Sequence, residues 1–178
     1  MQINYLDASR RKVDGNTLMM DGLTELPYGL AGTIYRSPLP FSPLFDPHGR
    51  LIAAYEAAGV DTVVMLNPTE EVQRLTGQDL AAFYRARGYQ VIHAPMPDFQ
   101  APPQAVLHHA LDRILEAARE GRTLVIHCHA GIGRTGTLAA CLAKAVFGIS
   151  GEDAIAWVRK FIPDAVENAA QVQFVVDF

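Results

Sequence analysis

The stretch RTLVIHCHAGIGRTG, residues 122–136, decides the fold, because it joins an apolar run to a glycine-rich turn and then to the start of a helix. Residues 122–127, RTLVIH, have an apolar centre and are rich in β-branched side chains, which predicts a buried strand. Residues 135–147 are small and apolar, which predicts a helix packed in the core. Ligand sites in α/β sheets lie where strands end. We therefore expect the turn between this strand and this helix to hold a ligand.

Strands and helices alternate on both sides of this stretch. Before it, the sequence predicts strands at 32–37, 61–66 and 89–95 and helices at 49–58, 77–88 and 103–120, with structured loops at 37–49 and 66–72. After it, we expect two helices, at 152–161 and 167–178. Strands separated by helices predict an α/β fold, a central, mostly parallel sheet flanked by helices.

The chain has 178 residues, 49% of them hydrophobic, which is enough to bury one core without a second domain. We predict an N-terminal arm over residues 1–29 that packs on one domain formed by residues 30–178. A net charge of −4 gives no general attraction to nucleic acid or to an anionic membrane. Because no apolar run has the length of a signal sequence or a membrane span, we expect a cytoplasmic protein with reduced cysteines.

Two fingerprints overlap in the central turn. From Gly131 to Gly136 it matches G-x-G-x-x-G, the turn that binds dinucleotides. Such a turn places its first glycine directly after the strand and needs an acidic residue about 20 positions later, at the end of a second strand. Here three residues intervene, and the acidic pair Glu152 and Asp153 falls in the first turn of an expected helix. We therefore favour the second fingerprint, H-C-x-x-G-x-x-R-T.

This second pattern suits a single tetrahedral anion. Five residues separate Cys128 from Arg134, so the loop can curl until its backbone N–H groups point inward. Gly131 and Gly133 are expected to take the positive φ that such a curl requires, and the following helix presents its positive end to the anion. A guanidinium binds two phosphate oxygens with a planar fork. The expected substrate-binding residues are therefore His129, Ala130, Gly131, Ile132, Gly133 and Arg134.

The same surroundings activate the thiol of Cys128. A free thiol has a pKa near 8.5, which falls to about 3.5–7.5 at a helix N-terminus beside an arginine. We expect a thiolate that attacks phosphorus, with Thr135 donating its hydroxyl to the sulfur. His127 is expected to orient the loop through backbone hydrogen bonds. Three consecutive residues cannot all face one ion, so we expect neither a metal nor another cofactor.

These residues resemble the signature loop of the cysteine-dependent protein tyrosine phosphatase superfamily, and the chain length is similar to that of its compact dual-specificity branch. The resemblance covers approximately residues 30–178 and includes YRSPLP at 35–40 and LNPTEEV at 66–72. The family uses an aspartic acid on a mobile loop roughly 30 residues before the cysteine. The resemblance therefore implies that Asp98, in APMPDFQAP, protonates the leaving oxygen and then accepts a proton from water.

The final segment, residues 165–178, resembles the last helix of kinase-associated and related dual-specificity phosphatases. In some of these a glutamine positions the hydrolytic water. By this register Gln171 is the first candidate and Gln173 the second. Glu70 or Glu71 is proposed to orient Arg134. The chain lacks a recognisable tyrosine-bearing recognition loop, so strict phosphotyrosine specificity is not predicted.

The sequence thus predicts a hydrolase of phosphate monoesters that takes a phosphorylated protein or a small phosphoester as substrate. Phosphotyrosine is expected, with phosphoserine and phosphothreonine as further candidates. Two alternatives stay open: a phosphoinositide or inositol phosphate phosphatase, and a noncatalytic module that recognises phosphate. The variable loop positions His129, Ala130 and Ile132 lack the basic side chains that favour a polyanion. Cys141 is expected in the core, with an oxidative partnership with Cys128 as the alternative.

Overall fold

A five-stranded sheet runs through the centre of the computed structural model, which describes residues 22–178. The strands lie in the order β1-β2-β5-β3-β4, and all neighbours are parallel except β1 and β2. The predicted α/β fold with a mostly parallel central sheet is confirmed. The bounds are β1 Thr24–Glu25, β2 Thr33–Ser37, β3 Thr62–Met65, β4 Gln90–His93 and β5 Thr123–His127.

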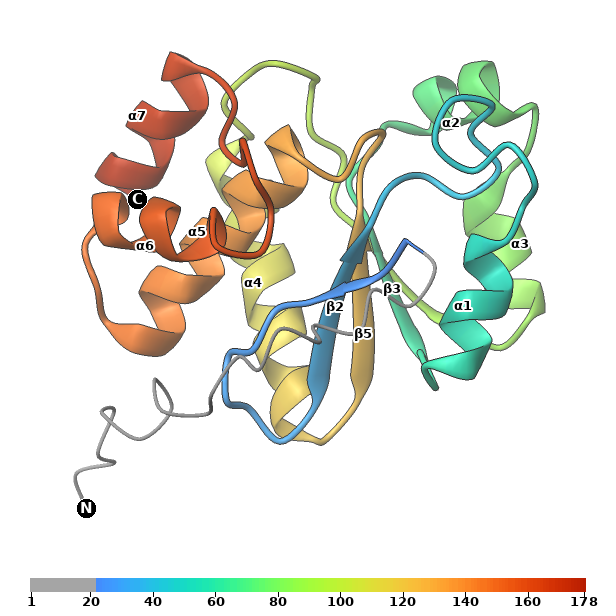
Figure 1. The fold of residues 1–178 in the computed structure, drawn as a ribbon, viewed down its shortest axis with the longest axis horizontal. Coiled ribbons are helices and arrows are strands. Elements are labelled where there is room, and N and C mark those ends of the chain that lie inside the picture. The colour runs from blue at the N-terminus through green and yellow to red at the C-terminus, as the bar shows by residue number, and fades with distance from the viewer. Residues whose placement is uncertain (1–21) are drawn as a thin grey trace.

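Helices cover both faces of this sheet. In Figure 1, α4 to α7 lie on one side of the strands and α1 to α3 on the other. The bounds are α1 Leu51–Ala57, α2 Thr69–Thr76, α3 Leu80–Ala86, α4 Gln104–Arg119, α5 Gly133–Phe147, α6 Gly151–Val158 and α7 Ala169–Asp177.

Two hydrophobic cores result from this layering, because alternate residues of a strand point to opposite faces. Along β5, Leu124 and Ile126 belong to the core shared with α4 to α7, whereas Val125 belongs to the core on the α1 and α3 side. Burial on both faces explains why Val63–Met65 of β3 and Leu124–Ile126 of β5 are all apolar.

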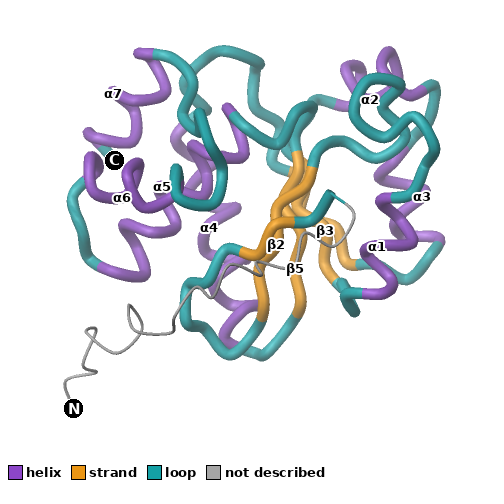
Figure 2. The backbone as a smooth tube through the Cα atoms, in the orientation of Figure 1, coloured by secondary structure: helices purple, strands orange, loops and turns teal. Residues whose placement is uncertain are grey.

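The carboxyl ends of the parallel strands share one edge of the sheet, and the loops that follow them gather there (Figure 2). Strand β5 lies in the middle of the sheet, between β2 and β3. Residues 128–132, which connect β5 to α5, are therefore surrounded by the loops after β2, β3 and β4. Side chains from several loops can thus reach one ligand.

Some elements differ from the sequence-based expectation. Strand β1 has only two residues and too short a pattern to detect, and it exists because it pairs with β2. Residues 69–76 form helix α2, although we expected residues 66–72 to be a loop. The helix follows Pro68, buries Val72 and is capped at its C-terminus by Gly77, where φ is +72°. Helix α7 begins at Ala169 rather than at residue 167, because the side chain of Asn168 caps it.

The predicted N-terminal arm falls mainly on residues 1–21, which lie outside the described residues. Of its remainder, Leu23, Leu26 and Tyr28 are buried. The boundary at residue 29 stays a prediction. Within residues 22–178, none of the helices combines the length and the apolar character that crossing a membrane requires.

Candidate active site

The loop between β5 and α5 is shaped by one glycine in a left-handed conformation. Gly131 has a φ of +73°, and a Cβ at this position would lie 2.5 Å from the carbonyl oxygen of Ser37. Glycine is therefore needed both for the turn and for the close approach of the chain after β2. We call residues 127–136 the signature loop.

Gly133 does not show the positive φ that we expected for both glycines, because it already belongs to helix α5. Glycine at this position instead leaves room for a neighbouring side chain. A Cβ here would collide with the carboxylate of Glu167, which lies directly against the first turn of α5. Burial raises the pKa of Glu167 and the charge of Asp98 adds to this effect, while Arg134 and the Gly133 backbone N–H oppose it. Our sequence analysis did not identify this carboxylate.

Cys128 follows the last residue of β5 and is 2% exposed. The nearby hydroxyl of Thr135 is buried and has no hydrogen-bond partner among the described residues. The expected hydrogen bond from Thr135 to the sulfur is therefore not formed here, and the hydroxyl is left with a free donor. Cys141 is also buried in the core, where burial raises the pKa of its thiol to about 12.

Arg134 is buried and held at one end by a carboxylate. Its Nη1 and Nη2 donate to the two carboxylate oxygens of Glu71 over 2.6 and 2.8 Å, and Nη1 also lies 3.3 Å from the carbonyl oxygen of Met96. Burial alone would raise the pKa of Glu71, but its hydrogen bonds from Arg134 and Asn67 and the charge of Arg134 bring it below the ordinary value. Of the two proposed glutamates, Glu71 is thus the one in contact with the arginine.

Asp98 lies at the other edge of this guanidinium. It belongs to residues 94–103, which connect β4 to α4 and which we call the acid loop. Its Oδ1 lies 3.3 Å from Nε of Arg134, and its side chain is 43% exposed. Glu71 therefore takes the Nη end of the arginine, while the Nε edge faces Asp98. The expected acid and the expected anion-binding arginine are brought together from two separate loops.

His127 is fixed from behind by the layer of α3. Its Nε2 forms a hydrogen bond of 3.0 Å with the hydroxyl of Tyr84, and its backbone carbonyl accepts from the N–H of Leu66. Burial lowers the pKa of His127 to about 3, so the ring is neutral at neutral pH. The expected backbone contact is present, and the contact with Tyr84 is one that our sequence analysis missed.

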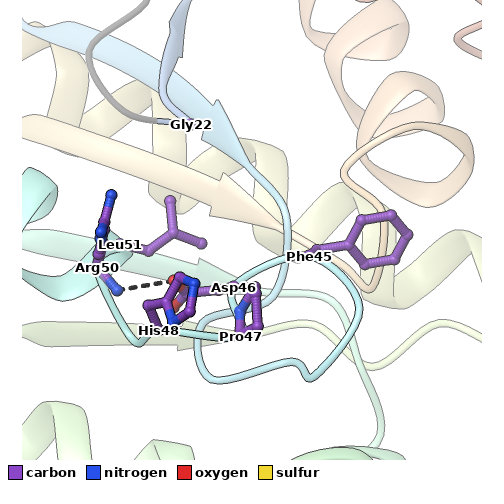
Figure 3. A pocket seen from close by; sticks show the side chains of 7 residues that line it. All are labelled: Gly22, Phe45, Asp46, Pro47, His48, Arg50 and Leu51. Atoms are coloured by element: carbon purple, nitrogen blue, oxygen red, sulfur yellow. Dashed lines mark hydrogen bonds between the residues drawn. The ribbon is translucent and has the colours of Figure 1, made fainter.

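His129 is held by residues 38–50, the loop after β2. Its carbonyl oxygen accepts from the N–H of Leu39, its Nε2 lies 3.4 Å from the hydroxyl of Ser42, and its ring packs edge-on against Phe45. Figure 3 shows a hollow on this loop that is lined by Phe45, Asp46 and their neighbours. The carboxylate of Asp46 accepts a hydrogen bond there from the backbone N–H of Arg50. This loop therefore forms one wall of the site, which the sequence alone did not reveal.

The two candidate glutamines occupy different surroundings. Gln171 is 1% exposed; its Oε1 accepts from the N–H of Glu167, and its Nε2 has no partner among the described residues. Gln173 is exposed and donates to Asp177 on its own helix. Of the two, only Gln171 has a buried amide with a donor to spare.

Together these elements can bind an oxyanion, place a thiol beneath it and hold a carboxyl group beside it. The anion would meet the start of α5 and the Nε edge of Arg134, where helix polarity and the guanidinium both favour negative charge. Within residues 22–178, no three His, Cys, Asp or Glu side chains come together as a metal site.

Known proteins are similar to this chain in sequence and fold. A family model described as a DSP-PTPase phosphatase of polymorphic toxin systems matches residues 50–145. The mouse dual specificity protein phosphatase CDC14B is 35% identical over 146 residues, which are 82% of this chain and 26% of that protein. The chain spans about a quarter or less of the length of the first curated relatives that it matches.

Solved structures agree with this match. Tk-PTP in its active form superposes with a TM-score of 0.69 at 31% identity and covers 82% of this chain and 90% of its own. Kinase-associated phosphatase, solved with serine in place of its catalytic cysteine, shares the fold with a TM-score of 0.82 at 19% identity, over 90% of this chain and 95% of its own. The chain therefore belongs to the DSP-PTPase phosphatase family, in the dual-specificity-like branch of the cysteine-dependent protein tyrosine phosphatases.

Proposed function

We propose that this protein hydrolyses phosphate monoesters in phosphoproteins, phosphotyrosine and also phosphoserine or phosphothreonine, through a phosphocysteine intermediate. The observation that carries the proposal is the meeting of two loops: Asp98 lies 3.3 Å from the arginine of the signature loop, which also contains Cys128. A carboxyl group at the free edge of an anion-binding guanidinium is in reach of an oxygen on a bound phosphate. The family membership supports the same reaction.

In the first step the Cys128 thiolate attacks phosphorus, the S–P bond forms, and the bond to the leaving oxygen breaks. Asp98 gives its proton to that oxygen, so the alcohol or phenol leaves neutral. Arg134, oriented by Glu71, and the backbone N–H groups of residues 129–134 stabilise the charge on the transferred phosphoryl group. The loop thus both binds the substrate and lowers the barrier.

In the second step water attacks the phosphocysteine, and Asp98, now ionised, accepts a proton from it. Gln171 is proposed to orient this water with its amide N–H groups, of which the structure leaves Nε2 unpaired among the described residues. The S–P bond breaks, inorganic phosphate leaves, and the thiolate is restored. His127 and Thr135 support the nucleophile, the first by fixing the loop and the second with its free hydroxyl. All these steps use side chains of this chain.

A phosphoprotein substrate is favoured over a phosphoinositide by the charges around the site. Glu167 adds a carboxylate beside the signature loop, and a polyanion would be repelled by it. A noncatalytic binding module is disfavoured because it has no need for a thiol and a carboxyl group at the same phosphate. We also infer a cytoplasmic location, since the reaction needs Cys128 reduced. Neither a nucleic acid nor a membrane is part of the proposal.

The proposal is tested with an aryl phosphate, then with phosphopeptides and phosphoinositides. We expect Cys128→Ser to remove turnover, by about 10⁴-fold or more, while still binding vanadate, and Asp98→Ala to lower it about 10²-fold or more. Because Cys128 must be ionised and Asp98 protonated at the same time, kcat/KM should show a bell-shaped, mildly acidic optimum. Equal activity of the wild type and Cys128→Ser, or a rate still rising above about pH 8, would contradict the mechanism.

A further inference from the structure

The acid loop is anchored before Asp98, where the N–H of Met96 donates to the carbonyl oxygen of Leu66 and the carbonyl oxygen of Met96 accepts from Arg134. Phe99, the residue after Asp98, is 64% exposed and has a φ of +55°. A non-glycine residue with positive φ is disfavoured and persists only when its surroundings hold it there. The N–H of Phe99 donates to the Asp98 carboxylate over 3.2 Å, so the conformation of Phe99 sets where this carboxylate lies.

The carbonyl oxygen of Phe99 accepts a hydrogen bond from a side chain near the C-terminus of the chain. Nδ2 of Asn168 donates to this oxygen over 3.2 Å. On its other side, Oδ1 of Asn168 accepts the backbone N–H of Gln171 over 3.0 Å and caps helix α7. One amide group therefore joins the acid loop to the first turn of the helix that carries Gln171.

We propose that Asn168 is a positioning residue that fixes Asp98 and Gln171 relative to the same phosphorus atom; this inference rests on the proposed function. Serine, threonine and aspartate cap a helix as well as asparagine does. Aspartate has no donor for the Phe99 carbonyl, and the serine hydroxyl lies closer to the backbone than the amide group. Asparagine provides the acceptor for the cap and the donor for the loop in one side chain.

Losing the donor should affect proton transfer more than phosphate binding. Without the hydrogen bond from Asn168, Phe99 is free to leave its left-handed conformation, and Asp98 moves with it. The signature loop, Glu71 and Arg134 do not depend on this bond, so an oxyanion should bind as before. The loss of kcat/KM should therefore be larger for a substrate whose leaving group needs a proton than for one whose leaving group does not.

The experiment compares Asn168→Ser with the wild type on two substrates, phenyl phosphate, whose leaving group needs a proton, and 4-nitrophenyl phosphate, whose leaving group needs it much less. We expect kcat/KM to fall about tenfold for phenyl phosphate and less than about twofold for 4-nitrophenyl phosphate. Inhibition by vanadate should stay unchanged. Asn168→Asp, which also keeps the cap and lacks the donor, should show the same preference for the better leaving group.

The matched control is Asp79→Ser, which exchanges an exposed capping side chain at α3, away from the site. It should change neither substrate's kcat/KM. Hydrogen exchange gives a readout that does not need activity: the Phe99 amide should exchange about tenfold faster in Asn168→Ser and at the wild-type rate in Asp79→Ser.

Equal losses on both substrates together with weaker vanadate binding would overturn the inference, since they would show a general structural defect. No loss on phenyl phosphate and unchanged exchange at Phe99 would overturn it as well. Both results leave the proposed function standing if the wild type is active and Cys128→Ser is not. Turnover that survives Cys128→Ser would instead refute the proposed function.

Discussion

The two halves of the candidate site are built in different ways. The signature loop is one continuous segment between a central strand and a helix, and its Cys128, Arg134 and Thr135 are all buried. The opposite half, which we call the acid half, consists of Asp98, Glu71, Asn168 and Gln171, and it comes from three segments that meet only in the fold. In the acid half, the side chain of Asp98 is exposed to solvent. The difference teaches that the local chain shapes the anion-binding loop, whereas the orientation of Arg134 and the proton transfer depend on a few long-range contacts.

The largest effect is expected where the signature loop is most constrained. Gly131→Ala would force an L-residue to a φ of +73° and place a Cβ 2.5 Å from the Ser37 carbonyl oxygen. We expect it to lower the free energy of unfolding by about 1–3 kcal/mol and kcat/KM by about 10²-fold or more, because the loop must move. Urea denaturation and turnover of an aryl phosphate measure both.

Gly59→Ala is the matched control for this variant. Gly59 has a similar φ of +69° but nothing within 4 Å of its Cβ position. We expect a loss of about 1 kcal/mol in stability and unchanged turnover. If both variants lost activity equally, the loop would not be the constrained half of the site, and the contrast between the halves would fail.

The way the two halves are encoded explains how much the sequence could predict. Cys128 to Arg134 lie within a few residues of one another, so their spacing alone indicates one anion site and a fold with a strand before it and a helix after it. Glu70 and Glu71 could not be told apart while residues 66–72 were taken for a loop. On helix α2 the two side chains point in different directions, and Glu71 is the one that meets Arg134.

The C-terminal residues show the same limit. Gln171 and Gln173 were both candidates because sequence gives no orientation to a short helix, and the packing of α7 buries only the first. Asn168 was overlooked because the helix was expected to start at residue 167. Glu167 was overlooked because its neighbour, Gly133, is distant in the sequence. Such contacts between segments leave no periodic pattern from which they could be predicted.

A smaller effect is expected from Glu71→Gln, which keeps the shape of the acid half but removes the charge that orients Arg134. We expect kcat/KM to fall about tenfold and vanadate to bind more weakly, because the guanidinium loses its bidentate partner. The matched control, Glu70→Gln, changes an exposed neighbour on the same helix and should leave both quantities unchanged. Equal effects of the two variants would show that charge in general, rather than the contact with Arg134, is responsible.

The pH dependence of stability gives a second measure of this contact. Because the pKa of Glu71 is lowered on folding, its contribution to stability is present above the ordinary value of 4.5 and is lost as the pH falls through the lowered value. The wild type should therefore have a larger free energy of unfolding than Glu71→Gln at pH 7, and this difference should disappear at acidic pH. If this difference stayed constant down to the pH of acid unfolding, the ion pair between Glu71 and Arg134 would not be its cause.

The smallest effect is expected behind the signature loop, where Tyr84→Phe removes the hydroxyl 3.0 Å from Nε2 of His127. We expect Tyr84→Phe to lower the free energy of unfolding by about 1–3 kcal/mol, because it leaves a buried ring nitrogen without a partner. Turnover should change less than about threefold, since the hydrogen bonds of the loop itself remain.

Burial lowers the pKa of His127 from 6.5 to about 3, so the wild type loses stability as the pH falls between these values. Because burial rather than Tyr84 causes this shift, thermal denaturation of both proteins should show the same slope across that range. Tyr89→Phe, a buried tyrosine of the same core, serves as the control. A slope that disappears in Tyr84→Phe alone would mean that the hydroxyl, not the burial, keeps His127 neutral, and that the signature loop depends on a long-range contact just as the acid half does.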